Sequence, residues 1–470
     1  INRSGYGQAL YIDHPITGHT SVYAHLDQFN DTITAYISKI QTEMETWEID
    51  IQLNENKIPI KKGEVLGILG NSGRSYGPHL HFEIRDKEER PINPMLFGID
   101  IKDSINPLIY SIYAYPLDEK SFINQSNEKK RLRLIPLKNG DYTVENIEAY
   151  GKIGFGIETI DRQNLAANKN GVYNIQTFVN GNKNFELDFR RFSFSETKHL
   201  NRLIDYGYYK TKKKRVQKLF NQNNPLSLYK DVLNDGVLSI KDSTYSVYKI
   251  KVSDFKNNNT WATVTIKGNK IVSNETQPKK ITPYYINANE TTNLKKGKVS
   301  VDFYKDTFYD NFYLDFDVKN DTLLLHEDII PTKKSFSISY DVSAYSDKDK
   351  NKLYIARLLG YKKFPAYSST KRKGDLLTTY SKTLGEFALA TDTIKPTITP
   401  INFKKGQWLS NFRYLKVKID DEISGISNYR ATVNGKWILM EYDYKTKTLT
   451  HDFNDKIITE TKNNLKLIVT

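Results

Sequence analysis

The chain has 470 residues, a length that predicts about three or four domains rather than one hydrophobic core. It contains no cysteine, which excludes disulfides and thiolate metal sites, so any metal would be bound by His, Asp or Glu side chains. The net charge of +14 favours approach to anionic polymers, but the basic residues are dispersed and accompany no nucleic-acid-binding motif, so we expect no nucleic-acid partner.

The first 100 residues predict an antiparallel β domain with a helical insertion. Alternating or apolar runs predict the strands Gln8–His14, Thr20–Leu26, Val65–Leu69 and His79–Arg85. Between them, residues 30–47 have a helical pattern, with Asn30 or Asp31 as the N-cap. The apolar face of this helix comprises Ile33, Ile37, Ile40 and Met44.

The remainder of the chain also favours β structure, and part of it is repeated. Asp103-Ser104-Ile105-Asn106-Pro107 matches Asp392-Thr393-Ile394-Lys395-Pro396, and each copy later contains an Asn-Gly pair between alternating runs. Asn-Gly supplies the positive φ angles of a tight hairpin. We therefore predict immunoglobulin-like β-sandwich modules at 101–272 and 392–470, the first with a Lys-rich insertion, and another β-rich domain at 273–391.

The candidate chemistry lies at the end of the first domain. In His79-Leu80-His81-Phe82-Glu83-Ile84-Arg85 every second residue is polar, so the pattern predicts that both imidazoles share one face of a strand. Two such imidazoles suit a divalent metal, although the spacing by itself is more often that of an exposed pair on a solvated strand. His25 ends an earlier strand and is either a third member of the site or a histidine of the rim or core.

Several motifs in a fixed order resemble one family. These are Gly5-Tyr6-Gly7, Tyr23-Ala24-His25-Leu26, Lys62-Gly63 before Val65, Gly70-Asn71-Ser72-Gly73 and Gly77-Pro78-His79-Leu80-His81-Phe82-Glu83. They are similar to the M23 family of lysostaphin-type and LytM-type zinc metallopeptidases. The resemblance covers about the first 100 residues and implies a mainly β fold for this domain.

The resemblance implies a zinc cofactor and assigns three roles. His81 corresponds to a zinc ligand, His79 to the histidine beside the attacking water, and His25 to the other catalytic histidine. The family's other two ligands come from an early His-x-x-x-Asp motif, which does not occur in the first 100 residues. We expect that motif upstream of Ile1, so the peptidase domain at 1–100 is interpreted as N-terminally truncated and the last module as C-terminally incomplete.

The function implied is a zinc endopeptidase that hydrolyses peptide crosslinks of peptidoglycan, with stem peptides as its partners. The alternative is an inactive M23-like scaffold that activates other wall hydrolases. The C-terminal modules suit spacers or protein-binding surfaces. Their order after an M23 domain implies an exported protein of the bacterial cell envelope, in the periplasm or at the outer membrane.

Overall fold

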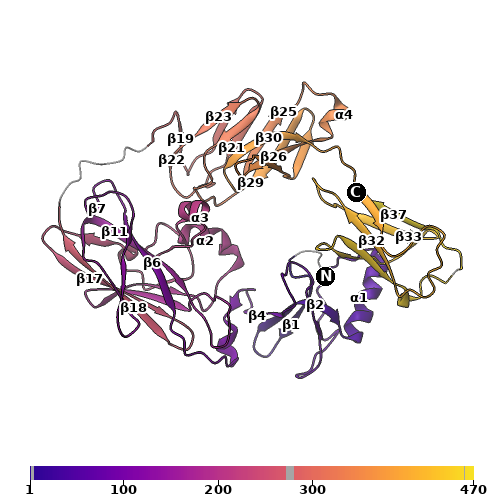
Figure 1. Cartoon of the computed structure of the whole chain (residues 1–470), viewed down its shortest axis with the longest axis horizontal. Helices are drawn as coiled ribbons and strands as arrows, with labels where there is room; N and C mark the ends of the chain where they lie inside the picture. The colour runs from indigo at the N-terminus through magenta and orange to yellow at the C-terminus, as the bar shows by residue number, and fades with distance from the viewer. Residues whose placement is uncertain (2–4, 271–279, 460) are drawn as a thin grey trace. The chain divides into compact units, whose positions relative to one another are not determined.

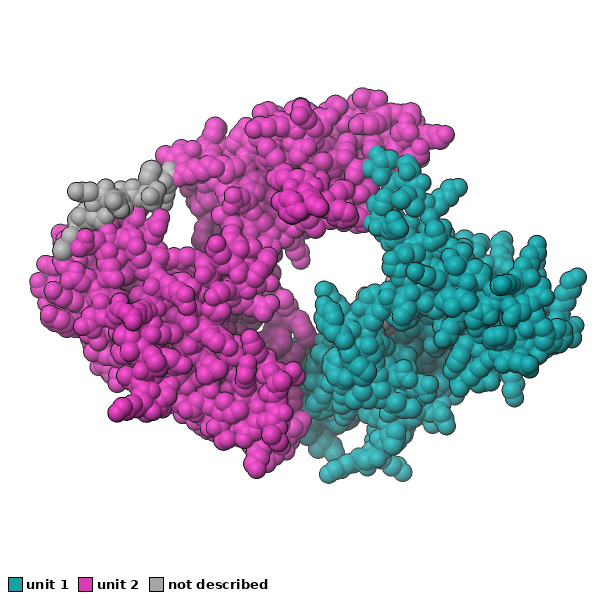
Figure 2. All heavy atoms as spheres, viewed as in Figure 1, with its two compact units in different colours: residues 1–89, 391–470 teal, residues 90–390 magenta. Residues whose placement is uncertain are grey.

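The computed structural model describes residues 1, 5–270, 280–459 and 461–470, and Figure 1 labels many of its elements. The chain forms two compact units. The first combines residues 1–89 with residues 391–470, and the second contains residues 90–390 (Figure 2). The prediction of a mainly β fold is confirmed. The predicted boundary between residues 272 and 273 lies outside the described residues, and no described helix has the length and apolar character to cross a bilayer.

A small antiparallel sheet carries the candidate histidines. Strand β2 is central to it and pairs antiparallel with β1, β3 and β4. The bounds are β1 (Gln8–His14), β2 (His19–Phe29), β3 (Gly67–Leu69) and β4 (His81–Arg85). The predicted meander is therefore present, but β3 and β4 each begin two residues later than the sequence pattern indicates.

Helix α1 (Asp31–Met44) is the predicted helical insertion. Asn30 is its N-cap, and the Asn30 side chain accepts a hydrogen bond from the Ile33 backbone N–H at 2.9 Å. Ile33 packs in a small core with Leu26 and Phe29 of β2. Met44 is 60% exposed although it was predicted for the same face, because the sheet core contacts the first turns and buried Gln41 fills the inward position near the end.

The second unit begins with a large β module at residues 108–268. Its long strand β11 (Ile147–Ile160) first pairs parallel to β18 (Asn259–Gly268) and then antiparallel to β6 (Leu108–Pro116). The change of partner occurs around Gly151, whose φ is +85° and whose position leaves no room for a Cβ beside Ser121. The remaining main strands are β12 (Asn174–Val179), β13 (Asn182–Asp188) and β17 (Tyr245–Ser253).

Residues 284–391 form two five-stranded sheets around one core of aliphatic and phenyl side chains. One sheet has the order β20-β21-β25-β29-β28 and the other β23-β24-β30-β26-β27. The bounds are β20 (Thr292–Lys296), β21 (Val299–Phe303), β25 (Phe336–Asp341), β29 (Leu376–Ser381), β28 (Thr370–Lys373), β23 (Phe316–Lys319), β24 (Thr322–Leu325), β30 (Gly385–Thr391), β26 (Leu353–Leu359) and β27 (Phe364–Ala366).

The C-terminal module is also built from two antiparallel sheets around one core. One contains β31 (Thr397–Pro400), β32 (Tyr414–Asp420), β36 (Thr448–Asp452) and β35 (Glu441–Asp443), and the other contains β34 (Lys436–Trp437), β33 (Tyr429–Val433) and β37 (Leu465–Val469). Trp47, which follows α1, belongs to this core together with Val417 and Leu449. The N-terminal segment therefore completes the core of the last module.

The two predicted Asn-Gly hairpins are present and have matching geometry. Asn180 and Gly181 have φ values of 50° and 87°, and Asn434 and Gly435 have values of 49° and 81°. Each asparagine side chain also accepts a backbone hydrogen bond. Asn180 accepts the N–H of Val247 in β17, and Asn434 accepts the N–H of Asn464, just before β37. The predicted type of turn is confirmed, and its cross-strand contact is repeated.

Candidate active site

The structure brings His25, His79 and His81 together although they are far apart in sequence. The ring centroids of His25 and His79 are 4.9 Å apart, and those of His25 and His81 are 5.6 Å apart. His25 comes from β2 and His81 from β4, where Ala24 pairs with His81 across the sheet. His79 lies outside β4, immediately after Gly77 and Pro78, so the expectation that both histidines sit within one strand is wrong.

A bulge in β2 positions the His25 ring. On one side of the break Gln8 pairs with Leu26, and on the other Leu10 pairs with Tyr23, so β2 contains one residue more than β1. His25 takes up the extra residue with a φ of 62°, and its N–H donates to Tyr6 O at 3.0 Å. Only 5% of His25 is exposed. A left-handed conformation is unfavourable for histidine and re-aims its side chain.

Hydrogen bonds determine which nitrogen of each ring carries a proton. Carbonyl oxygens can only accept, so Nδ1 of His25 donates to Ser72 O at 2.8 Å and Nδ1 of His79 donates to Gly77 O at 2.9 Å. In the neutral rings of both residues, Nε2 is then the basic nitrogen. His81 has the opposite tautomer, because its Nε2 donates to the Glu83 carboxylate at 2.6 Å and leaves the lone pair on Nδ1.

Glu83 is the centre of a partly buried polar network behind His81. Its Oε1 also accepts the Tyr6 hydroxyl at 2.6 Å, and its Oε2 accepts Nε of Arg85 at 2.7 Å. Burial alone raises the pKa of this carboxyl, but hydrogen bonds from His81, Arg85 and Tyr6 outweigh it and lower the pKa to about 2. Glu83 is therefore a carboxylate at neutral pH and fixes the tautomer of His81.

His25 is held neutral by its surroundings. Burial lowers its pKa, the neighbouring rings of His79 and His81 and the ammonium of Lys445 act in the same direction, and the hydrogen bond to Ser72 opposes them. A neutral imidazole with a free Nε2 can take up a proton at pH 7. The site thus contains two imidazoles whose Nε2 lone pair is available, His25 and His79. The third imidazole, His81, has its Nδ1 lone pair available and is supported by the Glu83 carboxylate.

Comparison with known proteins identifies relatives of two parts of the chain. Residues 48–94 match the model of Peptidase family M23, and residues 283–392 match the Zu5-like domain. The "DD-carboxypeptidase/endopeptidase Mpg" proteins of Neisseria meningitidis serogroup B and Neisseria gonorrhoeae are each 34% identical to this chain over 93 residues. The chain carries an M23-family peptidase domain. It is followed by a Zu5-like region.

The extent of these similarities is limited. The aligned segment covers 20% of this chain and 16% of the length of each Mpg protein. Among solved structures, the N-terminal eight Ig domains of Down Syndrome Cell Adhesion Molecule isoform 1.30.30 align over 77% of this chain and 64% of that chain. Their sequence identity is 8% and the TM-score is 0.11, which carries no argument about the fold. The immunoglobulin-like nature of the modules remains a prediction.

Two glycines hold the loops of the M23 domain against each other. A Cβ on Gly73 would lie 2.3 Å from the backbone N of Gly7, and a Cβ on Gly7 would lie 2.5 Å from the backbone N of Gly73. Both residues have positive φ angles, +65° at Gly7 and +64° at Gly73. This close approach brings Ser72 to the Leu26 carbonyl, which accepts the Ser72 hydroxyl at 2.7 Å, and thereby supports the carbonyl that orients His25.

The zinc implied by the M23 family can be tested against these donors. His81 fits a metal, because a carboxylate holds one ring nitrogen and the other keeps its lone pair. Among the described residues, the nitrogens of the three histidines do not all lie within 4.8 Å of one another, so they do not form a three-histidine metal site. His81 by itself suits a metal ligand, and the other two rings lie beside it. A His-x-x-x-Asp motif does occur at His451–Asp455, but His451 is buried in the C-terminal module and donates to Leu439 O.

Sequence reasoning assigned no role to Tyr6, Ser72, Glu83 or Arg85. The alternation in β4 already places His81, Glu83 and Arg85 on one face, and this signal could have indicated a supporting carboxylate. Tyr6 and Ser72 contribute through loops, and their contacts depend on tertiary structure. No local pattern shows that Ser72 O contacts His25 across 47 positions of sequence.

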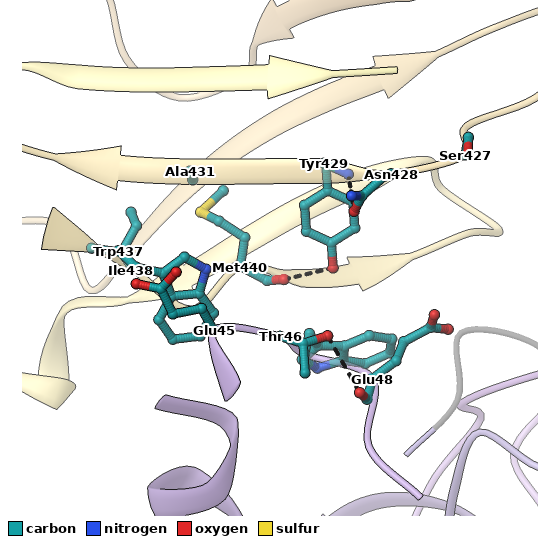
Figure 3. A pocket seen from close by; sticks show the side chains of 11 residues that line it. Glu45, Thr46, Glu48, Ser427, Asn428, Tyr429, Ala431, Trp437, Ile438 and Met440 are labelled. Atoms are coloured by element: carbon teal, nitrogen blue, oxygen red, sulfur yellow. Dashed lines mark hydrogen bonds between the residues drawn. The ribbon is translucent and has the colours of Figure 1, made fainter. Parts of the chain in front are cut away.

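A separate small pocket in the first unit is lined by none of the three histidines (Figure 3). Residues after α1 and residues of the C-terminal module line it, including Thr46, Trp47, Tyr429 and Met440. Its volume is about 70 Å³, below the roughly 300–1,000 Å³ of typical small-molecule sites. Figure 3 shows the Tyr429 hydroxyl donating to the Met440 carbonyl, at 2.9 Å. The pocket is part of the packing between these segments.

Proposed function

We propose that the M23 domain acts as a zinc-dependent endopeptidase on the peptide crosslinks of peptidoglycan, in the envelope of a bacterial cell. The observation that carries the proposal is the assembly of three histidines with fixed tautomers, one of them supported by a partly buried carboxylate. The similarity to the DD-carboxypeptidase/endopeptidase Mpg proteins supports this class of substrate. Location in the envelope follows from the same substrate.

Each histidine has a chemical task in this proposal. His81 would hold the zinc through Nδ1, while Glu83 retains the proton on Nε2. When bound, zinc supplies a Lewis acid that polarises the scissile carbonyl and acidifies water. His25 and His79 each bond a backbone carbonyl through Nδ1, so Nε2 is the nitrogen that could accept a proton during attack and return it to the leaving amine. The hydrogen bonds to Ser72 O and Gly77 O stabilise the protonated rings.

The experiment measures hydrolysis of purified crosslinked muropeptides by the natural protein that contains these residues, with zinc content determined on the same samples. His81→Ala should abolish both product release and zinc binding. His25→Ala and His79→Ala should abolish release and retain zinc. His14→Ala is the matched control, since His14 is exposed and its ring hydrogen-bonds to Ser21.

The competing function is an inactive scaffold that activates other wall hydrolases. The proposed enzyme is contradicted if the natural protein binds one equivalent of zinc but cleaves no muropeptide. It is also contradicted if His81→Ala leaves cleavage unchanged. Stimulation of a separate wall hydrolase by both the natural protein and the His81→Ala variant would support the scaffold.

A further inference from the structure

Three aspartates meet at one end of the large β module in the second unit. Asp103 precedes β6, Asp161 directly follows β11, and Asp254 directly follows β17. One carboxylate oxygen from each lies within 4.8 Å of the others. Asp161 is 5% exposed and Asp254 is 2% exposed. Each comes from a different segment, so this contact is created by the fold.

The negative charge of this cluster has no counter-charge among the described residues. None of the three aspartates forms an ion pair there, and nearby Lys256 pairs with Asp100 instead. Burial raises the pKa of Asp161 to about 6, a hydrogen bond from the Arg162 backbone opposes this shift, and the carboxylates of Asp254 and Asp103 add to it. Burying uncompensated carboxylates is costly, and proteins normally pair them or use them to coordinate metals.

One carboxylate oxygen of the cluster is buried without a hydrogen-bond partner, and this atom is Oδ1 of Asp161. Asp254 is supported differently, because the backbone N–H and the side-chain amide of Asn258 donate to its two oxygens at 2.8 and 2.6 Å. A buried, unpartnered carboxylate oxygen within reach of two other carboxylates is the environment that a cation would satisfy.

We propose that Asp103, Asp161 and Asp254 bind a calcium ion. The donors are hard oxygens only, which suits Ca²⁺ and disfavours zinc, a metal that prefers nitrogen and sulfur. Calcium–oxygen distances of about 2.3–2.6 Å place ligands at opposite sides of the ion at most roughly 5 Å apart, so three oxygens within 4.8 Å fit one coordination sphere. Backbone carbonyls and water complete such spheres.

The ion would fasten the segment that leads into the module. Residues 103–107 already contact the same end of the fold, where Asn258 Nδ2 donates to Asp103 O and the Thr260 hydroxyl donates to Pro107 O. Bound calcium would join this segment to the loops after β11 and β17 through three side chains. We therefore assign the site a structural role, independent of the peptidase chemistry.

The repeated module offers a matched control. Strand register makes Asp421 the counterpart of Asp161, since Ile160 pairs with Leu108 in the first copy and Asp420 pairs with Thr397 in the second. Oδ1 of Asp421 accepts the backbone N–H groups of Ser424 and Gly425, at 2.8 and 3.0 Å. Its charge is satisfied locally, so Asp421→Asn should leave calcium binding unchanged.

The test titrates CaCl₂ into the full chain after removal of metals with a chelator, following heat by calorimetry and thermal unfolding by circular dichroism. We expect one calcium per chain and a calcium-dependent rise in Tm, with affinity in the roughly 10⁻⁴–10⁻³ M range of extracellular calcium modules. MgCl₂ should bind more weakly. ZnCl₂ at equal concentration should not reproduce the effect on the second unit.

Asp161→Asn separates binding from folding. Without calcium, this variant should be at least as stable as the natural chain, because it relieves repulsion among buried carboxylates, and it should lose the calcium-dependent rise in Tm. A merely structural aspartate would instead lower Tm in both conditions. The proposal fails if CaCl₂ up to 10-fold above that range leaves Tm unchanged. It also fails if the Asp161→Asn and Asp254→Asn double variant keeps the full calcium response.

Discussion

Glu83 accepts a hydrogen bond from His81, which lies two residues earlier on the same strand, with Oε1 2.6 Å from Nε2. Side chains two residues apart on a strand share one face, so this contact needs no contribution from elsewhere in the fold. The Tyr6 hydroxyl and the Arg85 guanidinium then hold the carboxylate in place. The orientation of the His81 imidazole is therefore set by a neighbouring residue of β4, which Tyr6 and Arg85 hold in place.

Replacement of Glu83 tests this arrangement. Glu83→Gln should weaken zinc binding and lower the rate of muropeptide hydrolysis by about 10–100-fold, because the amide no longer fixes the His81 tautomer. The control is Glu89→Gln, since Glu89 contacts Arg85 but not the histidine. Equal zinc affinity in the natural protein and the Glu83→Gln variant would refute a supporting role for this carboxylate.

The stability of the M23 domain should depend on pH through Glu83. Its pKa of about 2 in the folded chain is below the ordinary value of 4.5, so the unfolded chain binds the proton more tightly. The stabilisation is complete above about pH 4.5 and is lost as the pH falls towards 2. The natural protein should therefore have a higher Tm than the Glu83→Gln variant above about pH 4.5, and this difference in Tm should shrink as the pH falls towards 2. A difference that stays constant would contradict the prediction.

Substitution of Gly73 should disturb the loop that orients His25. Gly73→Ala places a Cβ against the Gly7 backbone and imposes an unfavourable φ, so we expect a loss of about 1–3 kcal/mol in unfolding free energy together with lower peptidase activity. Gly77→Ala is the control, because a Cβ there meets nothing within 4 Å. Similar losses in the two variants, measured by denaturant unfolding, would show that the close approach of Gly7 and Gly73 is unimportant.

Trp47 should stabilise the C-terminal module. Trp47→Ala removes a large side chain from the core that contains Val417 and Leu449, and comparable truncations cost about 3–5 kcal/mol. Hydrogen exchange of the β32 amides should become faster. Trp408→Ala changes the same residue type at a position that is 68% exposed, and it should leave exchange unchanged. Unaltered β32 protection in Trp47→Ala would exclude Trp47 from this core.

The features that were predicted correctly depend on residues close together in the sequence. Alternation identified the strands, the Asn30 cap began the helix, and both Asn-Gly pairs form the expected turns. His79 lies outside β4 because it directly follows the Gly77-Pro78 turn, and pairing with β2 begins only at His81. The place of Trp47 in a distant core could not be read from sequence, and neither could the meeting of the three aspartates, because both depend on contacts between remote segments.

The left-handed backbone of His25 has a consequence for how the domain can change over time. Glycine or asparagine adopts this conformation more readily, so either residue at position 25 would relieve strain of about 1–3 kcal/mol. Selection for stability alone would thus tend to remove this imidazole. If His25 acts in catalysis as proposed, histidine at this position exchanges stability for activity, and a domain released from catalysis would be expected to lose it early.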